Sequence, residues 1–306
     1  MKKIDGRPNF FIVGAPKCGT TSMYAYLSGH PEIYFPRFKE PHHFASDIYS
    51  PLYVRDRQRY LDLYTGWQGE PVVGDASVWY LYSRRAAAEI HDFCSDARIL
   101  VMLRNPVEMV YSYHSQRLAW GNEDIRDFAA ALDAEEERKR GDRLPKNNPY
   151  PVEGLYYSEI ARYAEQLERY ITLFGRERLH VVLFDDFKSA TPAVFREVLL
   201  FLGVDPDYTP QFAVQNPNRV RRSMWLHNML YHAPGGVLTA AKMVVPPPLR
   251  RPLWGFLARA NTAYRQRPPI ETSQKRRLQQ CYRDDIQNLS GILDRDLEAL
   301  WLRGSP

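Results

Sequence analysis

One short loop constrains the fold of this chain more than any other feature. The apolar run Phe10–Val13 ends at Gly14, four residues separate Gly14 from Gly19, and a helix-like apolar stretch follows. A buried strand, a glycine-bracketed turn and a helix N-terminus together form a cradle for phosphate, because backbone N–H groups and the helix dipole attract an anion. The loop therefore predicts an α/β fold with a phosphate site after the first strand.

Further runs rich in Val, Ile and Leu support the same fold class. Their lack of polar alternation favours parallel strands covered on both faces. These runs are Pro71–Gly74, Arg98–Leu103 and Leu179–Phe184. Helices are expected over Tyr157–Phe174, which Gly175 ends, and over Thr191–Leu202. We predict a single P-loop-like domain over residues 1–306, with a mostly parallel central sheet flanked by helices.

The position of one lysine separates this loop from a nucleoside-triphosphate loop. In the triphosphate loop, a lysine directly follows the second glycine and holds the β- and γ-phosphates together with magnesium. Here Thr20 has that position, and Lys17 lies inside the turn. The loop is therefore better suited to one 5′-phosphate group, with a cation beside its leaving oxygen, than to a magnesium triphosphate.

Charge and composition narrow the class of protein. The chain has 306 residues and a net charge of +5, and residues 208–270 contain nine basic and no acidic residues. We expect an anionic partner at this basic segment. Cys18, Cys94 and Cys281 are too far apart for metal-ligand spacing, so no metal is expected. Without a secretory signal or an apolar run of membrane length, a soluble cytoplasmic protein is expected.

The segment Ala15–Ser22 resembles the 5′-phosphosulfate loop of sulfotransferases that use 3′-phosphoadenosine 5′-phosphosulfate (PAPS), in particular the branch of bacterial and glycosaminoglycan sulfotransferases. The resemblance covers nearly the whole chain. It implies in-line transfer of a sulfuryl group, without a metal, to a hydroxyl or amine of a small-molecule, lipid or carbohydrate acceptor, leaving 3′,5′-ADP. It also implies that the donor is held by Lys17, Cys18, Gly19, Thr20, Thr21 and Ser22.

A second segment resembles the family's 3′-phosphate site. Arg104 follows an expected strand, Asn105-Pro106 can begin a helix, and Ser112 comes about two turns later. Both Arg104 and Ser112 can reach a phosphate in the crevice where open α/β sheets bind ligands. Residues 216–223 lie where the family closes a loop over this phosphate. We expect Arg221 and Arg222 to make that contact.

A third segment, Phe38–Phe44, is the expected catalytic loop. Glu40 matches the general base of a similar Glu-Pro-His segment in the glycosaminoglycan branch, and His43 is a second candidate base because histidine titrates near neutral pH. The resemblance implies that Lys17 stabilises the charge that develops on the leaving oxygen. Asp75 and Ser77 either position Lys17 or the acceptor, or only form a strand-end turn.

Two segments and two functional alternatives stay open. Residues 121–151, with an exposed helix expected over Ile125–Arg143, form either a solvated excursion or a lid over the acceptor. The segment 208–270 closes over donor or acceptor, makes a peripheral membrane contact, or packs in the core. The alternatives to a sulfotransferase are a P-loop kinase and a non-enzymatic basic protein that binds nucleic acid or membrane. The main hypothesis expects no nucleic-acid partner, and it predicts neither the acceptor nor the oligomeric state.

Overall fold

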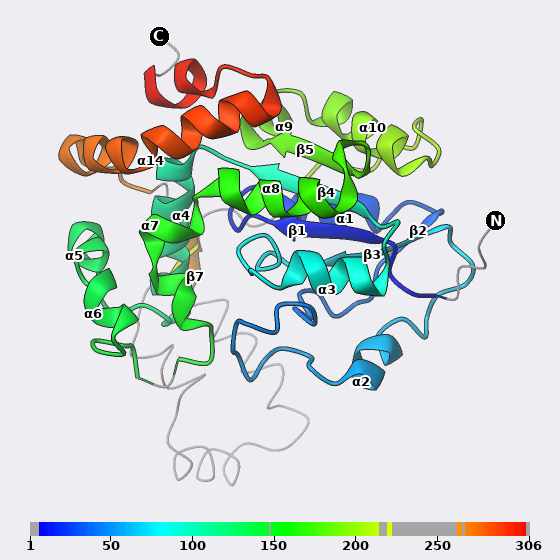
Figure 1. Ribbon diagram of the computed structural model, residues 1–306, viewed down its shortest axis with the longest axis horizontal. Coiled ribbons are helices and arrows are strands. Elements are labelled where there is room, and N and C mark those ends of the chain that lie inside the picture. Colours follow the sequence, from blue (N-terminus) through cyan, green and yellow to red (C-terminus); the bar gives the residue numbers. More distant parts are fainter. Residues whose placement is uncertain (1–5, 147, 214–218, 222–261, 265–266, 304–306) are drawn as a thin grey trace, which may run out of the picture.

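The computed structural model describes residues 6–146, 148–213, 219–221, 262–264 and 267–303. Its centre is a five-stranded parallel sheet with the strand order β2-β3-β1-β4-β5 (Figure 1). The strands are β1 (Phe10–Gly14), β2 (Ile33–Tyr34), β3 (Val72–Ala76), β4 (Arg98–Leu103) and β5 (Leu179–Leu183). The predicted α/β class with a parallel sheet is confirmed, and the short strand β2 is an addition that the sequence patterns did not predict.

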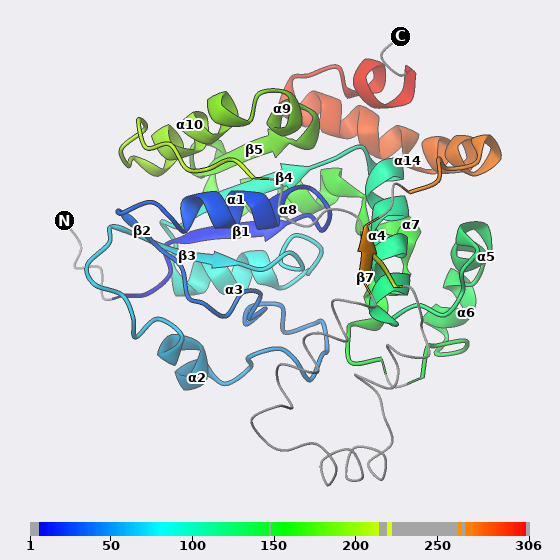
Figure 2. The same ribbon diagram turned by 180° about the vertical axis from the view of Figure 1, so that it is seen from behind.

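Helices cover both faces of this sheet, as the unbroken apolar strands require. Figure 2 shows α1 (Thr20–Leu27) in front of the sheet, and Figure 1, from the opposite side, shows α3 (Ala86–Phe93) and α8 (Tyr163–Phe174) in front of it. The ring of Tyr26 in α1 contacts Phe187 in α9 (Phe184–Ser189) and Phe195 in α10 (Thr191–Leu202). These aromatic contacts place α1, α9 and α10 in one layer.

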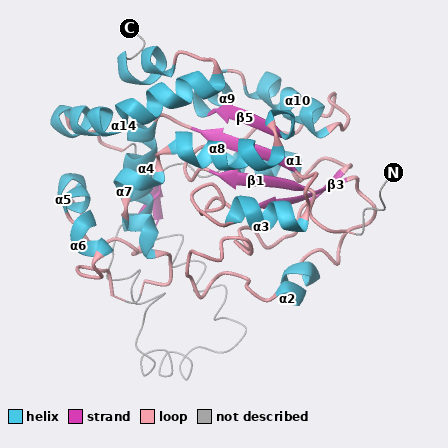
Figure 3. Cartoon of the chain, viewed as in Figure 1, coloured by secondary structure: helices cyan, strands magenta, loops and turns pink. Residues whose placement is uncertain are grey.

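The chain reverses its direction across the sheet at β1, and this reversal places the functional region. From β1 the chain reaches β2 and β3 on one side and β4 and β5 on the other. In open α/β sheets, ligands bind beyond the carboxyl ends of the strands at such a switch point. Figure 3 shows the strand arrows pointing toward the side where α4 (Pro106–Trp120) and α7 (Tyr157–Ile160) lie.

Several further elements complete the described part of the chain. They are α2 (Arg57–Asp62), α5 (Phe128–Asp133), α6 (Glu135–Lys139), α14 (Thr272–Leu293), the 3₁₀ turns Val152–Leu155 and Arg176–Arg178, the π-helical turn Ala299–Arg303, and the antiparallel pair β6 (Arg219–Arg221) and β7 (Thr262–Tyr264). Among the described residues, no helix is both long and apolar enough to cross a membrane.

The helix predicted over Tyr157–Phe174 is interrupted, so that prediction is wrong in its middle. Helix α7 ends at Ile160, and α8 begins at Tyr163. The cause is a tertiary cap: the carboxylate of Asp285, from α14, accepts hydrogen bonds from the backbone N–H groups of Tyr163 (2.8 Å) and Ala164 (3.2 Å). A carboxylate that accepts from the first free N–H groups starts a new helix at this point.

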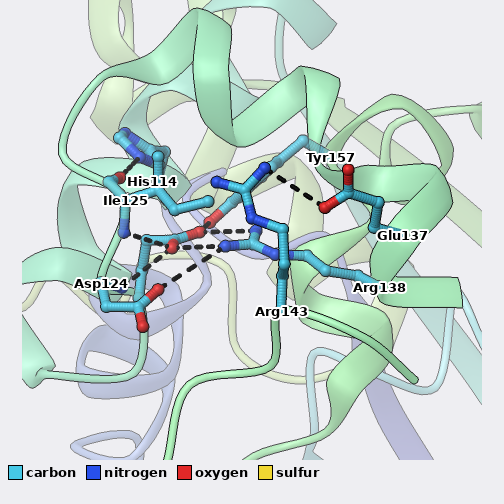
Figure 4. A network of polar contacts seen from close by, with 8 residues as sticks. His114, Asp124, Ile125, Glu137, Arg138, Arg143 and Tyr157 are labelled. Carbon is cyan, nitrogen blue, oxygen red and sulfur yellow. Dashed lines mark hydrogen bonds and ion pairs between the residues drawn. The ribbon is translucent and has the colours of Figure 1, made fainter. Parts of the chain in front are cut away.

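The prediction of an exposed helix over Ile125–Arg143 is also wrong. The segment forms two short helices, α5 and α6, and Arg138 of α6 is buried. Its guanidinium forms two hydrogen bonds, of 2.6 and 2.8 Å, with the buried carboxylate of Glu123, which also accepts from the Tyr157 hydroxyl (2.8 Å). Figure 4 shows Arg138, Asp124 and Tyr157 gathered in this network. Because the charge of Arg138 is buried and paired, the segment is not a solvated helix.

Candidate active site

The phosphate loop joins β1 to α1 and is tied to the sheet at its start. The N–H of Ala15 donates to the carbonyl of Met102 in β4 (2.7 Å). Gly19 adopts φ 90°, and a Cβ atom there would lie 3.1 Å from the ring of Phe187, so the turn requires glycine. The hydrogen bonds of α1 begin with Ser22 and Met23 donating to the carbonyl of Gly19. The preceding N–H groups therefore lie outside the helix ladder, as an anion cradle requires.

The side chains of the loop differ in what they can contribute to binding a phosphate group. Burial raises the pKa of the Cys18 thiol to about 12, against the opposing charge of Arg104, so Cys18 is a neutral thiol packed in the core. Thr20 is buried, while Lys17, Thr21 and Ser22 are partly exposed. Cys18 can therefore contribute only its backbone to a phosphate. Lys17, Thr21 and Ser22 can contribute side chains.

Arg104 is fastened to the loop from the end of β4. Its Nη1 donates to the carbonyl of Lys17 (3.4 Å), and Nε and Nη2 both donate to the carboxylate of Glu108, at 3.1 and 2.7 Å. The guanidinium also lies 4.6 Å from the ring centroid of Phe184. The structure thus brings Arg104 and the Lys17 turn together, as the sequence predicted for two parts of one phosphate site.

Ser112 has a basic partner that sequence reasoning did not select. Nη2 of Arg267 donates to the buried Ser112 hydroxyl (2.9 Å), and its guanidinium lies 5.3 Å from the ring centroid of Tyr111. Burial, followed by the charge of Arg104, lowers the pKa of Arg267, and its Nε is buried without a partner among the described residues. Arg267 at the Ser112 hydroxyl, within electrostatic reach of Arg104, therefore forms a cationic site suited to a phosphate.

The expected contacts from Arg221 and Arg222 stay untested. Arg221 lies in β6, which the structure describes by its backbone pairing with β7, and Arg222 lies outside the described residues. Arg267 follows β7 in the same basic segment. The shortage of acidic residues pointed to the segment, whereas no local pattern distinguished Arg267 from the other arginines there.

The carboxylate of Glu40 has two close partners. Lys39 Nζ donates to Oε1 (2.9 Å), and His42 Nε2 lies 3.3 Å from Oε2. Burial alone would raise the pKa of Glu40, but the charge of Lys39 and the His42 contact overcome it and hold the pKa at about 2. Lys39 Nζ also donates to the Thr21 hydroxyl in the first turn of α1 (3.3 Å). Lys39, which sequence reasoning missed, therefore links Glu40 to the phosphate loop.

The two neighbouring histidines have different surroundings. His42 is buried and contacts Glu40, whereas His43 stacks on the ring of Tyr60 at a centroid distance of 4.2 Å. His43 Nδ1 lies 2.8 Å from the carbonyl oxygen of Val54. The structure therefore brings His42, not the predicted rival base His43, to the Glu40 carboxylate.

Asp75 and Ser77 support the backbone of this loop. The Asp75 carboxylate is fully buried and accepts from the hydroxyls of Tyr60 (2.8 Å), Tyr80 (2.8 Å) and Ser77 (2.7 Å). The Ser77 hydroxyl in turn accepts from the backbone N–H of His42 (3.1 Å). Of the two expected roles, positioning is the one that fits, but the positioned group is the loop that carries Glu40 rather than Lys17.

Arg55 holds the same loop from its other end. Its guanidinium donates to the carbonyls of His42 (3.0 Å), His43 (3.2 Å) and Ala45 (2.7 Å). A planar guanidinium with several fixed donors is well suited to hold a non-repetitive backbone in one conformation. The loop between β2 and α2 is therefore fixed by side chains instead of by secondary structure.

These parts combine an anion-binding region with an ionised carboxylate. The phosphate loop and Arg104 lie at the carboxyl ends of β1 and β4, and Lys39 joins the loop to Glu40. Within the described part of the chain, no three His, Cys, Asp or Glu side chains gather in an arrangement that could hold a metal ion. The arrangement can hold a phosphorylated group on one side and accept a proton on the other.

Comparison with known proteins agrees with this geometry. Residues 7–229 match the model of the sulfotransferase domain family. The chain is 29% identical over 252 residues to carbohydrate sulfotransferase 15 of Rattus norvegicus, a match that covers 65% of this chain and 44% of the relative. It is 27% identical over 221 residues to bifunctional heparan sulfate N-deacetylase/N-sulfotransferase 2 of Homo sapiens, with 67% and 23% covered. The chain thus spans less than half the length of these curated relatives.

A solved structure matches over nearly the full length. The crystal structure of a sulfotransferase from Alicyclobacillus acidocaldarius gives a TM-score of 0.71 at 31% identity, and the match covers 96% of this chain and 98% of that one. The family match includes the phosphate loop, Glu40, Arg104 and Ser112. On this evidence, the chain belongs to the sulfotransferase family.

Proposed function

We propose that this protein transfers a sulfuryl group from PAPS to a hydroxyl or amine of an acceptor and releases 3′,5′-ADP. One observation carries the proposal: Arg104 contacts the phosphate loop at the carboxyl ends of β1 and β4, and Lys39 links the same loop to the Glu40 carboxylate. A kinase is less well supported, because Thr20 stands where a triphosphate loop has its lysine.

The donor would be held at both of its phosphates. The N–H groups of the loop and the Thr21 and Ser22 side chains would hold the 5′-phosphosulfate. Arg104, Ser112 and Arg267 would hold the 3′-phosphate. The buried Nε of Arg267, which has no partner among the described residues, fits this role, because an added anion would satisfy it. Holding both ends would orient the sulfur toward the acceptor.

Transfer would proceed by in-line displacement. The acceptor oxygen forms a bond to sulfur and gives its proton to the Glu40 carboxylate, while the bond from sulfur to the 5′-phosphate oxygen breaks and leaves its electron pair on that oxygen. Lys17 stabilises the charge that develops there. With a pKa of about 2, Glu40 is ionised at neutral pH but is a weak base. The proton therefore moves as the new bond to sulfur makes the hydroxyl acidic.

We propose a carbohydrate as the acceptor, sulfated at a hydroxyl or an amine. Two of the matched relatives carry "carbohydrate" and "heparan sulfate" in their names. The match to each covers about two thirds of this chain. Small-molecule and lipid acceptors, which the sequence also allowed, have no corresponding support among these relatives.

Nucleotide binding tests the donor assignment directly. 3′,5′-ADP should stabilise the protein by about 2.7 kcal/mol at 100 times its dissociation constant, and adenosine 5′-phosphate, which lacks the 3′ group, should stabilise it much less. Thermal unfolding with each nucleotide measures the difference. Arg267→Met should reduce the difference, whereas Arg283→Met, an exposed arginine on α14, should preserve it. Equal shifts from both nucleotides in the unmodified protein would contradict the proposed 3′-phosphate site.

A further inference from the structure

A buried arginine that the donor site does not use lies on α4. The side chain of Arg117 is 1% exposed, and its Nε, Nη1 and Nη2 atoms all lack a hydrogen-bond partner among the described residues. No carboxylate or carbonyl of that part of the chain therefore accepts from it. A buried guanidinium without an anionic or hydrogen-bonding partner is strongly unfavourable, so a native protein that retains one calls for an explanation.

Two aromatic rings flank this guanidinium. Its central carbon lies 5.8 Å from the ring centroid of Tyr113 and 5.6 Å from that of Tyr150. Aromatic rings stabilise a cation through their faces but do not satisfy its N–H donors. Tyr150 is partly exposed, whereas Arg117 is not, so Tyr150 stands on the solvent side of the guanidinium. The N–H groups along the planar edge of the Arg117 guanidinium can therefore pair with two oxygens of an oxyanion.

The same two tyrosines connect Arg117 to Glu40. Burial is the main cause of the raised pKa of Tyr113; the charge of Arg117 and its contact with the Tyr113 hydroxyl oppose this increase, and the charge of Glu40 adds to it. The pKa of Tyr150 is raised by burial and then by Glu40, again with Arg117 in opposition. Both hydroxyls thus lie within electrostatic reach of the carboxylate and of the guanidinium. Arg117 and Glu40 therefore act on the same two tyrosines.

Other buried polar atoms near Glu40 also lack partners among the described residues. They are the hydroxyl of Tyr53, Nδ1 of His42 and Oε2 of Glu153. The rings of Tyr53 and His42 are 4.3 Å apart. A Cβ atom on Gly154 would lie 2.8 Å from the Tyr113 hydroxyl, so the chain beside Glu153 packs against the same cluster. Several orphan donors and acceptors in one place match a ligand with many hydroxyl groups.

We propose that Arg117 binds an oxyanionic group of the acceptor, a carboxylate or a sulfate ester on the sugar whose hydroxyl is presented to Glu40. This inference rests on the proposed sulfuryl transfer and specifies its substrate class. The guanidinium edge pairs with two oxygens of the anion, Tyr113 and Tyr150 cover its faces, and Tyr53 and Glu153 contact neighbouring hydroxyls. The Tyr150 side chain moves aside to admit the group, because it separates Arg117 from solvent.

A matched set of sugars tests the proposal by binding. The probes are glucose, glucuronic acid and glucose 6-sulfate, which differ only at the sixth carbon and so compare no anion, a carboxylate and a sulfate ester. Each is titrated into protein saturated with 3′,5′-ADP, and thermal unfolding is followed. We expect one or both anionic sugars to bind roughly 10- to 100-fold more tightly than glucose, as charge-assisted hydrogen bonds at a buried site would give.

Variants separate an acceptor role of Arg117 from a structural one. Arg117→Gln should abolish the preference for the anionic sugars, and Arg117→Lys should restore part of it. Arg126→Gln, which removes an exposed arginine close to α4, should leave the preference unchanged. An Arg117→Gln protein that binds 3′,5′-ADP normally but retains the preference would overturn the proposal. Equal binding of all three sugars to the unmodified protein would also overturn it.

The test keeps the two proposals apart. If 3′,5′-ADP itself fails to stabilise the unmodified protein, the proposed function is wrong, and the anion site falls with it. If 3′,5′-ADP binds but neither anionic sugar binds better than glucose, only the role of Arg117 is wrong. If only glucuronic acid or only glucose 6-sulfate shows the preference, the oxyanion is assigned to the carboxylate or to the sulfate ester.

Discussion

At the scale of single residues, the protonation state of Glu40 depends on its immediate neighbours. The carboxylate is bound by Lys39 and His42, and without them burial would favour the neutral acid. Lys39 and His42 are positioning residues in the proposed reaction, because they act on the base and not on the acceptor. Their effect should therefore be visible in the pH dependence of the reaction rather than in donor binding.

Replacing Lys39 should move the acidic limb of the pH profile. With its pKa held at about 2, Glu40 stays ionised as the pH falls, so activity is lost only near that value or when the protein unfolds. In Lys39→Met the opposing effect of burial is no longer balanced, and the acidic limb of kcat/KM should rise by roughly 1–3 pH units. Lys39→Arg keeps the charge and serves as the control. Identical limbs in the two variants would exclude the positioning role.

Replacing Glu40 itself tests the assignment of the base. Glu40→Gln keeps the size of the side chain but removes proton acceptance, so turnover should fall by roughly 10²–10⁴ with 3′,5′-ADP binding nearly unchanged. His43→Ala should cost far less turnover, because His43 is turned toward Tyr60 and Val54. Turnover measured with PAPS and a sugar acceptor decides between them. Near-normal Glu40→Gln beside an inactive His43→Ala would transfer the role to His43.

At the scale of elements, the start of α8 is set by a residue from another helix. The carboxylate of Asp285 in α14 accepts from the first N–H groups of α8, and the hydroxyl of Tyr282 in α14 donates to the carbonyl of Tyr157 (2.7 Å). Two helices far apart in sequence are thereby fixed relative to each other. Tyr157, in α7, also donates its hydroxyl to the Glu123 carboxylate.

Removing this cap should destabilise the fold measurably. Asp285→Ala leaves the N–H groups of Tyr163 and Ala164 without their acceptor, and the free energy of unfolding should fall by about 0.5–2 kcal/mol. Asp284→Ala, at the exposed neighbouring position, is the matched control and should change it little. Urea unfolding of both variants measures the difference. Equal stabilities would mean that α8 does not need the cap.

At the scale of the whole molecule, the segment 121–151 folds around a buried ion pair, whose carboxylate also bonds to a residue outside the segment. Glu123 and Arg138 are fully buried and paired, and Glu123 also accepts from Tyr157. The same segment carries Tyr150, which flanks Arg117. The segment with the buried ion pair therefore also supplies a residue of the proposed acceptor site.

Breaking the ion pair should be far more costly than replacing it. Glu123→Ala leaves Arg138 buried without its partner and should cost about 3–5 kcal/mol, whereas the double variant Glu123→Leu with Arg138→Met should recover most of the loss. Burial opposes ionisation of Glu123, but the Arg138 bond lowers its pKa overall. Stability from this pair is therefore present above the unfolded pKa of about 4.3 and is lost as pH falls below it. Denaturant melts at pH 7 and pH 3 check both expectations, and an equally unstable double variant would contradict them.

Much of the fold and part of the site are local properties of the sequence. The apolar runs predicted β1, β3, β4 and β5 with end-point shifts of at most two residues, because a strand covered on both faces needs continuous apolar residues. The phosphate loop was equally predictable, since a glycine-bracketed turn between a strand and a helix has few possible conformations. The prediction that Arg104 and Ser112 bind a phosphate followed from their positions, at the end of a strand and about two turns into the next helix.

Only the tertiary structure decided which distant residues complete the site. Arg267 reaches Ser112 across 155 positions of sequence, and Asp285 caps α8 from 122 positions beyond Tyr163. No local pattern marks such partners, because any arginine in the basic segment or any acidic residue on α14 could have served. Packing also decides that His42 rather than His43 contacts Glu40, and it buries Arg117 among tyrosines. Hydrophobic periodicity acts between neighbours in sequence, whereas charge pairing and hydrogen bonding act between neighbours in space.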